Sequence, residues 1–452
     1  MTLRAPTPSP NAPAPRARLQ SLLASGAYLS YAYSYPHKTA YRALAPAIDL
    51  RALWAAEDRS ALFLYLHVPF CEQRCGFCNL FTQAQPRDGL EARYLAALER
   101  QAEIVGELLA PAQFAQLAVG GGTPTFLSAP LLDRLLQVAR KLGASGVPSS
   151  VEISPATFDD EKLAVLVAHG TTRVSMGVQS FVAAETSAVQ RRQALVDVER
   201  ALAGLRGAIP TRNVDLIYGL PGQTEATLCA SIDRAIELGA NELYLYPLYV
   251  RPLTVLGRRA SWNDLRLPLY RAGRDHLLTL GFRQVSMRMF AAPQKNVALP
   301  SPAGPQYRCQ RDGMVGLGAG ARSYTQRVHY ASPYAISQAG VKSKIADWID
   351  QPASSFAVAS HGIVLSDEEQ RRRFVLLSLL DAGIDRAAYR ARFGGEVLAQ
   401  LPELAEAIDA GLATLDAGSL RLTDAGLERA DVFGHWLQSQ AVRDLRAEWG
   451  EA

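Results

Sequence analysis

Short apolar runs alternate with amphipathic stretches between residues 60 and 246, and this alternation constrains the fold more than any other feature of the chain. Strands separated by helices favour a parallel sheet wrapped by helices, as an open or closed barrel. We therefore predict an α/β fold with a partial (β/α) barrel whose chemistry lies at the carboxyl ends of its strands. The expected strands are Ala61–Leu66, Gln116–Val119, Val151–Ile153, Arg173–Met176, Val214–Ile217 and Leu243–Tyr246.

The pattern changes to helices from about Ser366, with a short strand candidate at Ser419–Thr423. This change predicts a small, mostly helical C-terminal domain of winged-helix type. Three arginines at 371–373 follow three acidic residues, which favours a solvated helix face over a nucleic-acid surface. The first 48 residues carry five basic and no acidic residues, so a formal charge of +4 leaves the rest of the chain close to neutral. Net charge gives no reason to expect a nucleic acid partner.

The cysteine count bears on the cellular compartment. Five cysteines in 452 residues are too few for a disulfide framework, and three of them fall within eight positions. That clustering favours metal chemistry in a reducing cytoplasm. No apolar run approaches the roughly 20 residues that a membrane span needs, and the Pro- and Ala-rich start lacks the apolar core of a secretory signal. We therefore expect a cytoplasmic protein without a membrane span.

The three clustered cysteines, Cys71, Cys75 and Cys78, follow the first expected strand. Three thiolates in one loop can hold three irons of a cubane [4Fe–4S] cluster and leave the fourth iron open. The amino and carboxylate groups of S-adenosylmethionine (SAM) can bind such an open iron, and this arrangement is the one that reductive SAM cleavage requires. A zinc site completed by His67 or a remote ligand, and chance clustering, are the alternatives. Closed zinc sites usually pair two short ligand motifs, and the sequence has no second pair.

Four segments resemble, in order, the radical SAM enzymes of the oxygen-independent coproporphyrinogen III oxidase family, which includes HemN and the heme chaperone HemW. They read LYLHVPFCEQRCGFC, GGGTPTFL, RVSMGVQSF and DLIYGLPGQT, and the C-terminal LSDEEQRRRFVLLSLLDAGID resembles the end domain of the family. The likeness covers most of the chain from about Tyr33. It implies a partial barrel with a cluster near its mouth, and cleavage of SAM to methionine and a 5′-deoxyadenosyl radical.

The resemblance also implies roles for single residues. Tyr65 would help to hold the SAM nearest the cluster, Phe77 would pack against a nucleoside, and Glu152 would contact SAM. The turn at Gly121, Gly122 and Thr123 would meet the methionine end of SAM, and glycines after a strand do let backbone N–H groups approach a carboxylate. The positions that match a second SAM site in the coproporphyrinogen enzyme are Gln179, Arg191 and Asp215.

Each of these positions has a plainer alternative. The glycine turn could be only a tight bend, and Glu152 or Asp215 could cap a helix. Arg191 could lie in solvent, as most arginines do, and Arg192 competes for the same place in the motif. His67 could orient the cluster loop or pass a proton, but a structural histidine is an equal alternative.

Two departures from the family pattern limit the resemblance. The coproporphyrinogen enzyme has a fourth cysteine just after the motif, where this chain has Asn79, so oxidative decarboxylation of coproporphyrinogen is in doubt. The heme chaperone carries a histidine motif before its Gly-Leu-Gly run, but this chain has no histidine between His276 and His329. Cys309 lies in the segment that replaces it. We hypothesise that Cys309 supplies a hydrogen atom or a thiolate contact to the substrate, with a small buried cysteine as the alternative.

Together these observations predict a radical SAM enzyme that acts on a small organic molecule, either tetrapyrrole-like or a natural-product intermediate. A flavodoxin- or ferredoxin-like protein would supply the electron, and a second SAM stays open, as does heme binding by a chaperone. A winged-helix regulator with a redox-sensing cluster is a third alternative. The expected division is a flexible tail at 1–20, an N-terminal arm over the active site at 21–59, the barrel at 60–290, a substrate-side connecting region at 291–360 and the HemN-like C-terminal domain at 361–452.

Overall fold

A computed structural model describes residues 15–29, 34–250, 256, 264–293, 313–381 and 383–450. Cys309, the hypothesised substrate contact, lies outside these residues. The chain divides into two compact units, one formed by Met1–Pro36 with Arg371–Asp444 and the other by His37–Gln370 with Leu445–Ala452. Among the described residues, no helix combines the length and the apolar character needed to cross a membrane.

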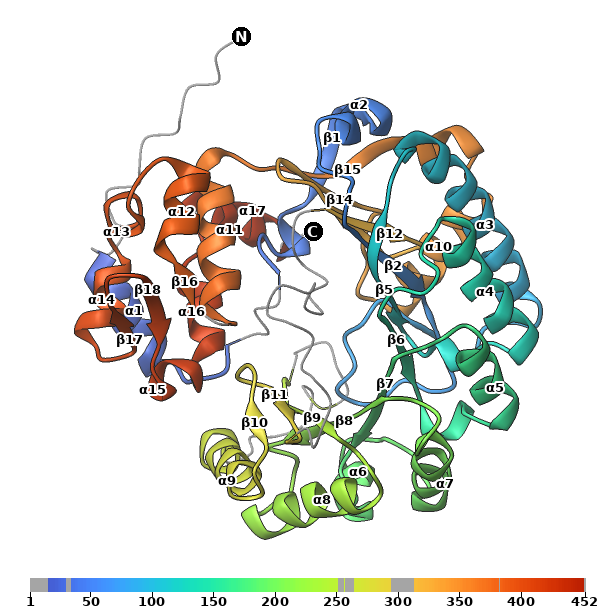
Figure 1. The fold of residues 1–452 in the computed structure, drawn as a ribbon, viewed down its shortest axis with the longest axis horizontal. Coiled ribbons are helices and arrows are strands. Elements are labelled where there is room, and N and C mark those ends of the chain that lie inside the picture. Colours follow the sequence, from blue (N-terminus) through green and yellow to red (C-terminus); the bar gives the residue numbers. More distant parts are fainter. Residues whose placement is uncertain are drawn as a thin grey trace. The chain divides into compact units, whose positions relative to one another are not determined.

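The larger unit is built on a parallel sheet that follows the predicted alternation (Figure 1). Six neighbouring strands run parallel in chain order and are joined by helices on the outer face of the curved sheet, which confirms the predicted α/β barrel. These strands are β2 (Leu62–Val68), β5 (Phe114–Gly121), β6 (Ser149–Ile153), β7 (Arg173–Gln179), β8 (Thr211–Tyr218) and β9 (Glu242–Pro247). The helices of this unit include α2 (Leu50–Ala55), α3 (Leu90–Leu109), α4 (Ala129–Lys141), α5 (Asp160–Ala168), α6 (Ala183–Ala188), α7 (Leu195–Leu205), α8 (Glu225–Glu237), α9 (Arg266–Thr279) and α10 (Gln338–Asp350).

Further strands extend the sheet at both ends. On one side β12 (Met314–Leu317) pairs in parallel with β2 and leads to antiparallel β13 (Arg322–Tyr324), β14 (Val328–Ala331), β15 (Val358–Val364) and β1 (Arg42–Asp49). On the other side β9 pairs with antiparallel β11 (Met289–Ala291) and then β10 (Arg283–Gln284). Because β1 and β10 are the two edges in the described part of the chain, the sheet is open there rather than closed into a complete barrel.

The smaller unit is mostly helical, as predicted for the C-terminal domain. Its three short strands form a separate sheet in the order β16 (Ile384–Asp385), β18 (Ser419–Leu422), β17 (Ala413–Leu415). Its helices are α1 (Pro15–Ala24), most of α11 (Asp367–Leu379), α12 (Arg386–Phe393), α13 (Val397–Gln400), α14 (Leu404–Asp409), α15 (Asp424–Leu427), α16 (Ala430–Trp436) and the start of α17 (Gln440–Gly450). Residues 15–20, which the sequence assigns to a tail, begin α1. Leu19 is buried, and Arg18 Nη2 donates to the carbonyl of His435 at 2.7 Å.

Helix α8 begins with a capping box just after the DLIYGLPGQT segment. Thr224 Oγ1 accepts from the amide of Thr227, while Thr227 Oγ1 accepts from the amide of Thr224. Because Thr224→Ala leaves the Thr227 amide without this acceptor, we expect the free energy of unfolding to fall by about 1 kcal/mol, measured by urea titration. Thr224→Ser keeps the hydroxyl and should lose much less. Equal losses for the two variants would contradict a role for the cap.

Candidate functional site

The cysteine loop leaves the carboxyl end of β2. Its start, β3 (Phe70–Cys71), pairs in parallel with β4 (Gln83–Ala84), and Cys71, Cys75 and Cys78 are free and partly buried. Burial is the main cause that raises the pKa of the Cys71 thiol to about 12, and the neighbouring Cys78 and Cys75 contribute to the rise. Burial also raises the pKa of Cys78. The three sulfurs are therefore close enough to repel one another as thiolates, and a bound cation would offset this repulsion.

The donor set fits a cluster better than a single ion. A zinc ion needs each sulfur at about 2.3 Å, whereas in a cubane each thiolate binds a different iron and the sulfurs lie further apart. Because the sequence offers no second pair of zinc ligands, three cysteines in one loop fit a cluster with one open iron better than a closed zinc site.

The glycine turn at the end of β5 rests directly on the cysteine loop. The amide of Gly122 donates to the carbonyl of Val68 at 2.7 Å, and the amide of Thr123 donates to that of Phe70 at 2.7 Å. Thr123 Oγ1 also donates to Cys71 Sγ at 3.5 Å. A Cβ on Gly122 would lie 2.4 Å from the Phe70 oxygen and 3.0 Å from Cys71 Sγ. The turn is therefore a tight bend, and its tightness is what brings β5 against the cysteine loop.

His67 lies under this turn and is held as a neutral ring. Its Nδ1 lies 3.1 Å from the Tyr65 hydroxyl and its Nε2 lies 3.4 Å from the Phe81 carbonyl, contacts that the tautomer protonated on Nε2 satisfies. Burial lowers the pKa of His67 to about 4. Gly121 has a φ of +118°, and a Cβ there would lie 2.6 Å from the imidazole ring. A neutral ring with both nitrogens occupied favours the structural alternative over proton transfer.

Glu152 binds the other side of the glycine turn. Its Oε2 accepts from the amide of Gly121 at 3.0 Å, so it does not act as a helix cap, and Asp159 caps the following helix α5 instead. Burial raises the pKa of Glu152 to about 7, with the amide of Gly121 opposing the shift and Asp215 adding to it. The side chain is also open to solvent on one side, so water weakens the effect of burial.

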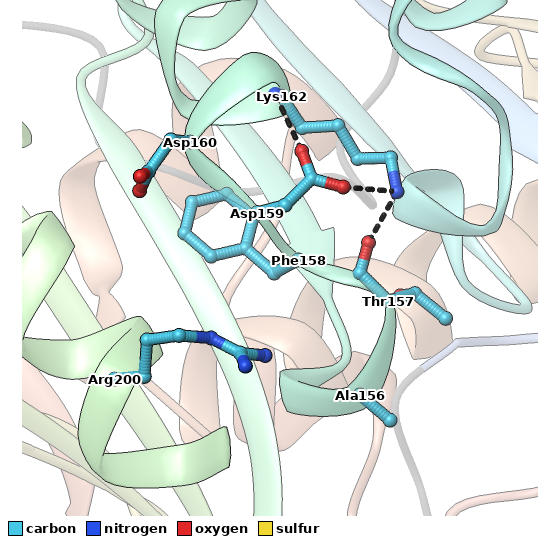
Figure 2. A pocket seen from close by; sticks show the side chains of 7 residues that line it. All are labelled: Ala156, Thr157, Phe158, Asp159, Asp160, Lys162 and Arg200. Carbon is cyan, nitrogen blue, oxygen red and sulfur yellow. Dashed lines mark hydrogen bonds and ion pairs between the residues drawn. The ribbon is translucent and has the colours of Figure 1, made fainter.

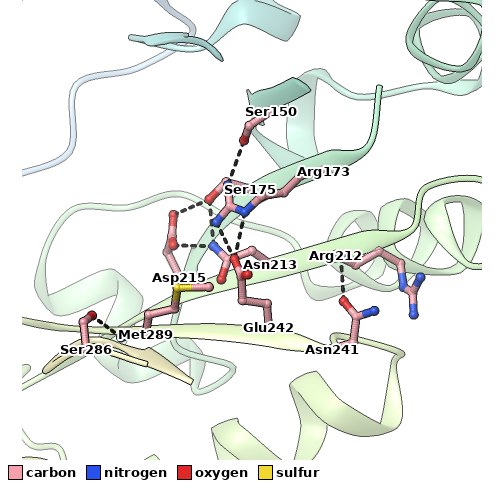
Figure 3. A network of polar contacts seen from close by, with 10 residues as sticks. All are labelled: Ser150, Arg173, Ser175, Arg212, Asn213, Asp215, Asn241, Glu242, Ser286 and Met289. Carbon is pink, nitrogen blue, oxygen red and sulfur yellow. Dashed lines mark hydrogen bonds and ion pairs between the residues drawn. The ribbon is translucent and has the colours of Figure 1, made fainter. Parts of the chain in front are cut away.

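A polar network joins side chains of the neighbouring strands β6, β7, β8 and β9 (Figure 3). The strand register aligns Glu152 of β6 with Ser175 of β7, Asn213 of β8 and Glu242 of β9. Arg173 donates to Glu242 at 2.6 Å, and Asp215 accepts from Asn213 at 2.7 Å. Burial raises the pKa of Asp215 to about 6, although hydrogen bonds from Asn213 and Ser175 oppose the shift. Asp215 therefore lies within the sheet network and not at a helix end.

Arg191 lies beside the cysteine loop, and Gln179, the last residue of β7, lies with it against Gly177. Gln179 has a φ of +72° at an irregularity in the pairing of β7 with β8. A side chain in this left-handed region is strained, and such strain is common at functional sites. Arg191 Nη1 donates to Cys75 Sγ at 3.4 Å, and its Nη2 donates to the carbonyl of Gly177. Arg192 is exposed, so Arg191 is the arginine that points toward the cysteines.

Phe77 anchors the far end of the cysteine loop. Its ring packs against a buried apolar cluster that follows β7, β8 and β9 and consists of Val189, Ile217, Leu220, Leu248 and Leu256, with Tyr246 beside it. Phe77 therefore lies next to Cys78 at the carboxyl ends of the strands. This is where a nucleoside contact is expected.

Beyond Arg191, the loop after β7 makes contacts with the cysteine loop that the sequence does not predict. Gln73 Nε2 donates to the carbonyl of Arg192 at 2.7 Å, and the amide of Arg192 donates back to Gln73 Oε1 at 3.2 Å. The amide of Gly76 donates to the carbonyl of Val189 at 2.9 Å. Glutamine and backbone contacts of this kind leave no periodic signal, and only the polar VQRRQ segment in the sequence hints at them.

A separate surface pocket of about 310 Å³ lies between the start of α5 and helix α7 (Figure 2). In it Lys162 binds the Asp159 carboxylate at 3.0 Å and the Thr157 carbonyl at 2.5 Å, and Arg200 lies on the opposite wall. None of the predicted site residues lines this pocket. Because none of the three clustered cysteines borders it, we place the chemistry at the cysteine loop.

The barrel carries a three-cysteine loop after its first strand, β2, and a glycine turn after the next strand, β5. This combination defines the radical SAM class of enzymes. In agreement, residues 65–235 match the radical SAM superfamily and residues 365–428 match the HemN C-terminal domain. The chain belongs to the HemN-like oxygen-independent coproporphyrinogen III oxidase family of radical SAM enzymes.

Relatives and a solved structure give the extent of this similarity. The chain is 30% identical over 400 residues to an oxygen-independent coproporphyrinogen III oxidase of Cereibacter sphaeroides, covering 84% of this chain and 86% of that protein. It is 34% identical over 238 residues to the heme chaperone HemW of Mycobacterium tuberculosis, covering 51% of this chain and 59% of that protein. The structure of coproporphyrinogen III oxidase HemN from Escherichia coli superposes with a TM-score of 0.76 at 23% identity, covering 90% and 97%. That structure supports the fold.

Proposed function

We propose that this chain holds a [4Fe–4S] cluster on Cys71, Cys75 and Cys78 and cleaves SAM reductively to act on a small organic substrate. When bound, the cluster supplies one electron for cleavage of SAM to methionine and a 5′-deoxyadenosyl radical. The observation that carries the proposal is the glycine turn, because it contacts Cys71 through Gly122 and Thr123 and Glu152 through Gly121. A ligand on this turn would reach both the cluster and the strand ends.

The residues around the turn suit the parts of SAM. We assign the methionine end to Gly121, Gly122 and Thr123, and a ribose hydroxyl or ammonium group to Glu152. Tyr65 would border the same ligand, and Phe77 would pack against a nucleoside. We assign to His67 the positioning of Tyr65 and the glycine turn. Tyr65 donates to His67 Nδ1, and the His67 carbonyl accepts from the Tyr94 hydroxyl at 2.6 Å.

A second SAM is proposed at Gln179, Arg191 and Asp215. Asp215 lies in β8, opposite Gly177 of β7. Arg191, in the loop after β7, donates to Cys75 Sγ and to the carbonyl of Gly177. The Asp215 carboxylate, whose pKa burial raises to about 6, would be stabilised in its charged form by a cationic ligand such as a sulfonium. Formation of S-adenosylhomocysteine would support methyl transfer from this second molecule.

The end of the cysteine loop indicates a planar, anionic substrate. Tyr334 donates to the carbonyl of Asn79 at 3.0 Å, and its ring lies 5.9 Å from that of Phe81. The ammonium group of Lys38 lies 3.4 Å from the centre of the Tyr334 ring. Aromatic rings and a cation together suit a tetrapyrrole-like carboxylate or an aromatic natural-product intermediate. For Cys309, a hydrogen-atom or thiolate contact to this substrate remains our hypothesis.

Heme binding by a chaperone is the second candidate function, and the match to HemW favours testing it. The sequence has no histidine between His276 and His329, and His276 already binds Asp233 at 2.6 Å. An axial ligand for heme would therefore have to come from elsewhere. In either case, an oxygen-sensitive thiolate site suits a reducing cytoplasm, and a flavodoxin- or ferredoxin-like protein would be the donor.

The deciding experiment uses anaerobically reconstituted protein with dithionite and SAM, with and without heme. Mass spectrometry follows 5′-deoxyadenosine, methionine and S-adenosylhomocysteine, and omission of dithionite is the control. We expect 5′-deoxyadenosine and methionine in equal amounts, formed only with reductant. Stoichiometric heme uptake without SAM cleavage would overturn the enzymatic proposal in favour of the chaperone.

A further inference from the structure

The loop after β7 reaches from the cysteine loop to the protein surface. Its inner side is bound to the cysteine loop in three places: the Gln73 side chain bonds to the backbone of Arg192, the Gly76 amide donates to the Val189 carbonyl, and Arg191 donates to Cys75 Sγ at 3.4 Å. Only the backbone of Arg192 takes part in these contacts. The surface of the loop is thus separated from a cluster ligand by one arginine side chain.

The outer side of this loop carries an unusual surface, which we call the α7 patch and define as Arg192, Leu195 and Val196. Arg192 is exposed, and Leu195 and Val196 keep 39% and 67% of their surface accessible, so two large apolar side chains lie beside a cation. The guanidinium of Arg192 has no ion-pair partner among the described residues. The acidic side chains that follow in α7, Asp197 and Glu199, pair with Arg200 at 2.9 Å and Arg234 at 2.6 Å, so the charge of Arg192 is left unpaired at this part of the described surface.

We propose that the α7 patch is the docking surface for the acidic, flavodoxin-like protein that delivers the electron. This inference rests on the proposed function. An exposed cation beside apolar side chains matches an acidic partner with an apolar rim around its flavin, and the small area suits the transient interfaces of electron transfer. One electron leaves the reduced flavin and is consumed when the carbon–sulfur bond of SAM breaks to methionine and the 5′-deoxyadenosyl radical. The electron would pass from the patch along residues 191–192 to Cys75.

Negative charge introduced at the patch distinguishes an effect on flavodoxin docking from an effect on SAM cleavage itself. Arg192→Glu and Val196→Asp are compared with Arg140→Glu, which reverses an exposed charge in the last turn of α4. SAM cleavage is driven either by dithionite, which needs no docking surface, or by flavodoxin with its reductase. We expect unchanged dithionite-driven rates in Val196→Asp and Arg140→Glu. With flavodoxin, Arg192→Glu should raise the KM for flavodoxin by about tenfold and weaken its salt dependence, and Arg140→Glu should leave both unchanged.

Three results would overturn the docking proposal. An unchanged KM for flavodoxin in both patch variants would place docking elsewhere on the protein. An equal loss with dithionite and with flavodoxin would show that Arg192 maintains the site itself. An absence of dithionite-driven cleavage in the unsubstituted protein would instead refute the proposed function and the docking inference with it.

Discussion

Gly122→Ala is expected to lose most of its bound iron and sulfide after reconstitution, with a matching loss of SAM cleavage. The added methyl group would lie 2.4 Å from the carbonyl oxygen of Phe70 and 3.0 Å from Cys71 Sγ. The first of these is backbone within the β3–β4 pair and cannot rotate away. Overpacking of this kind costs about 1–3 kcal/mol, which corresponds to about a 5- to 150-fold loss in cluster affinity if it falls on the bound state.

The control for this experiment is Gly204→Ala. Gly204 lies within α7, where a Cβ would make an ordinary contact at 3.6 Å with Leu163, and alanine favours the helix. Iron and sulfide analysis with the visible spectrum of the reconstituted protein measures the outcome. A full cluster content in Gly122→Ala would show that the turn can move away from Cys71, which would remove the main support for the proposed SAM position.

SAM affinity is expected to fall as the pH drops from about 8 to about 6, and Glu152→Gln should reduce this dependence. Burial raises the pKa of Glu152 to about 7, so the SAM-free protein holds a proton on this carboxyl below that pH. If SAM binds the ionised carboxylate, binding is strongest above the pKa and weakens by up to about tenfold per pH unit below it. Solvent at Glu152 and the nearby Arg173 and Asp215 charges modify this slope.

Equilibrium dialysis of SAM against the reconstituted, unreduced protein measures this effect. The amino group of SAM also titrates near pH 8, so the difference in slope between the two proteins isolates Glu152. At about pH 8, Glu152→Gln removes a charged hydrogen bond and should weaken binding by about 10- to 150-fold, from about 1.5–3 kcal/mol. Glu161→Gln, on the exposed face of α5, is the matched control. Identical slopes for unsubstituted protein and Glu152→Gln would exclude Glu152 from the SAM site.

The barrel could be predicted from the sequence because apolar strands and amphipathic helices have distinct periods. The same logic placed Cys71, the glycine turn and Glu152 near one another, since the carboxyl ends of parallel strands meet at one edge of a sheet. The antiparallel strands β13, β14 and β15 were not anticipated. Strands β13 and β14 have only three and four residues, and the side chains of β15 do not alternate regularly between core and surface.

Other features depend on contacts that leave no local signal. Helix α1 belongs to the same compact unit as the C-terminal domain, and Arg18 bonds to Gln438 across 420 positions of sequence. Gln179 has a positive φ, and the sequence does not predict this because glutamine rarely adopts the left-handed backbone conformation. The pair formed by Gln73 and Arg192 likewise exists only because two irregular loops meet.

The open sheet bears on how relatives of this protein could diverge. In a closed barrel, the diameter is tied to the number of strands and their stagger, so a change in size must break the ladder of hydrogen bonds. Here β1 and β10 end the described sheet without pairing to each other. The width of the interior can therefore change through the twist of the sheet and the segments outside its strands. Selection for larger or smaller substrates could act on those segments while the cysteine loop and the glycine turn stay fixed.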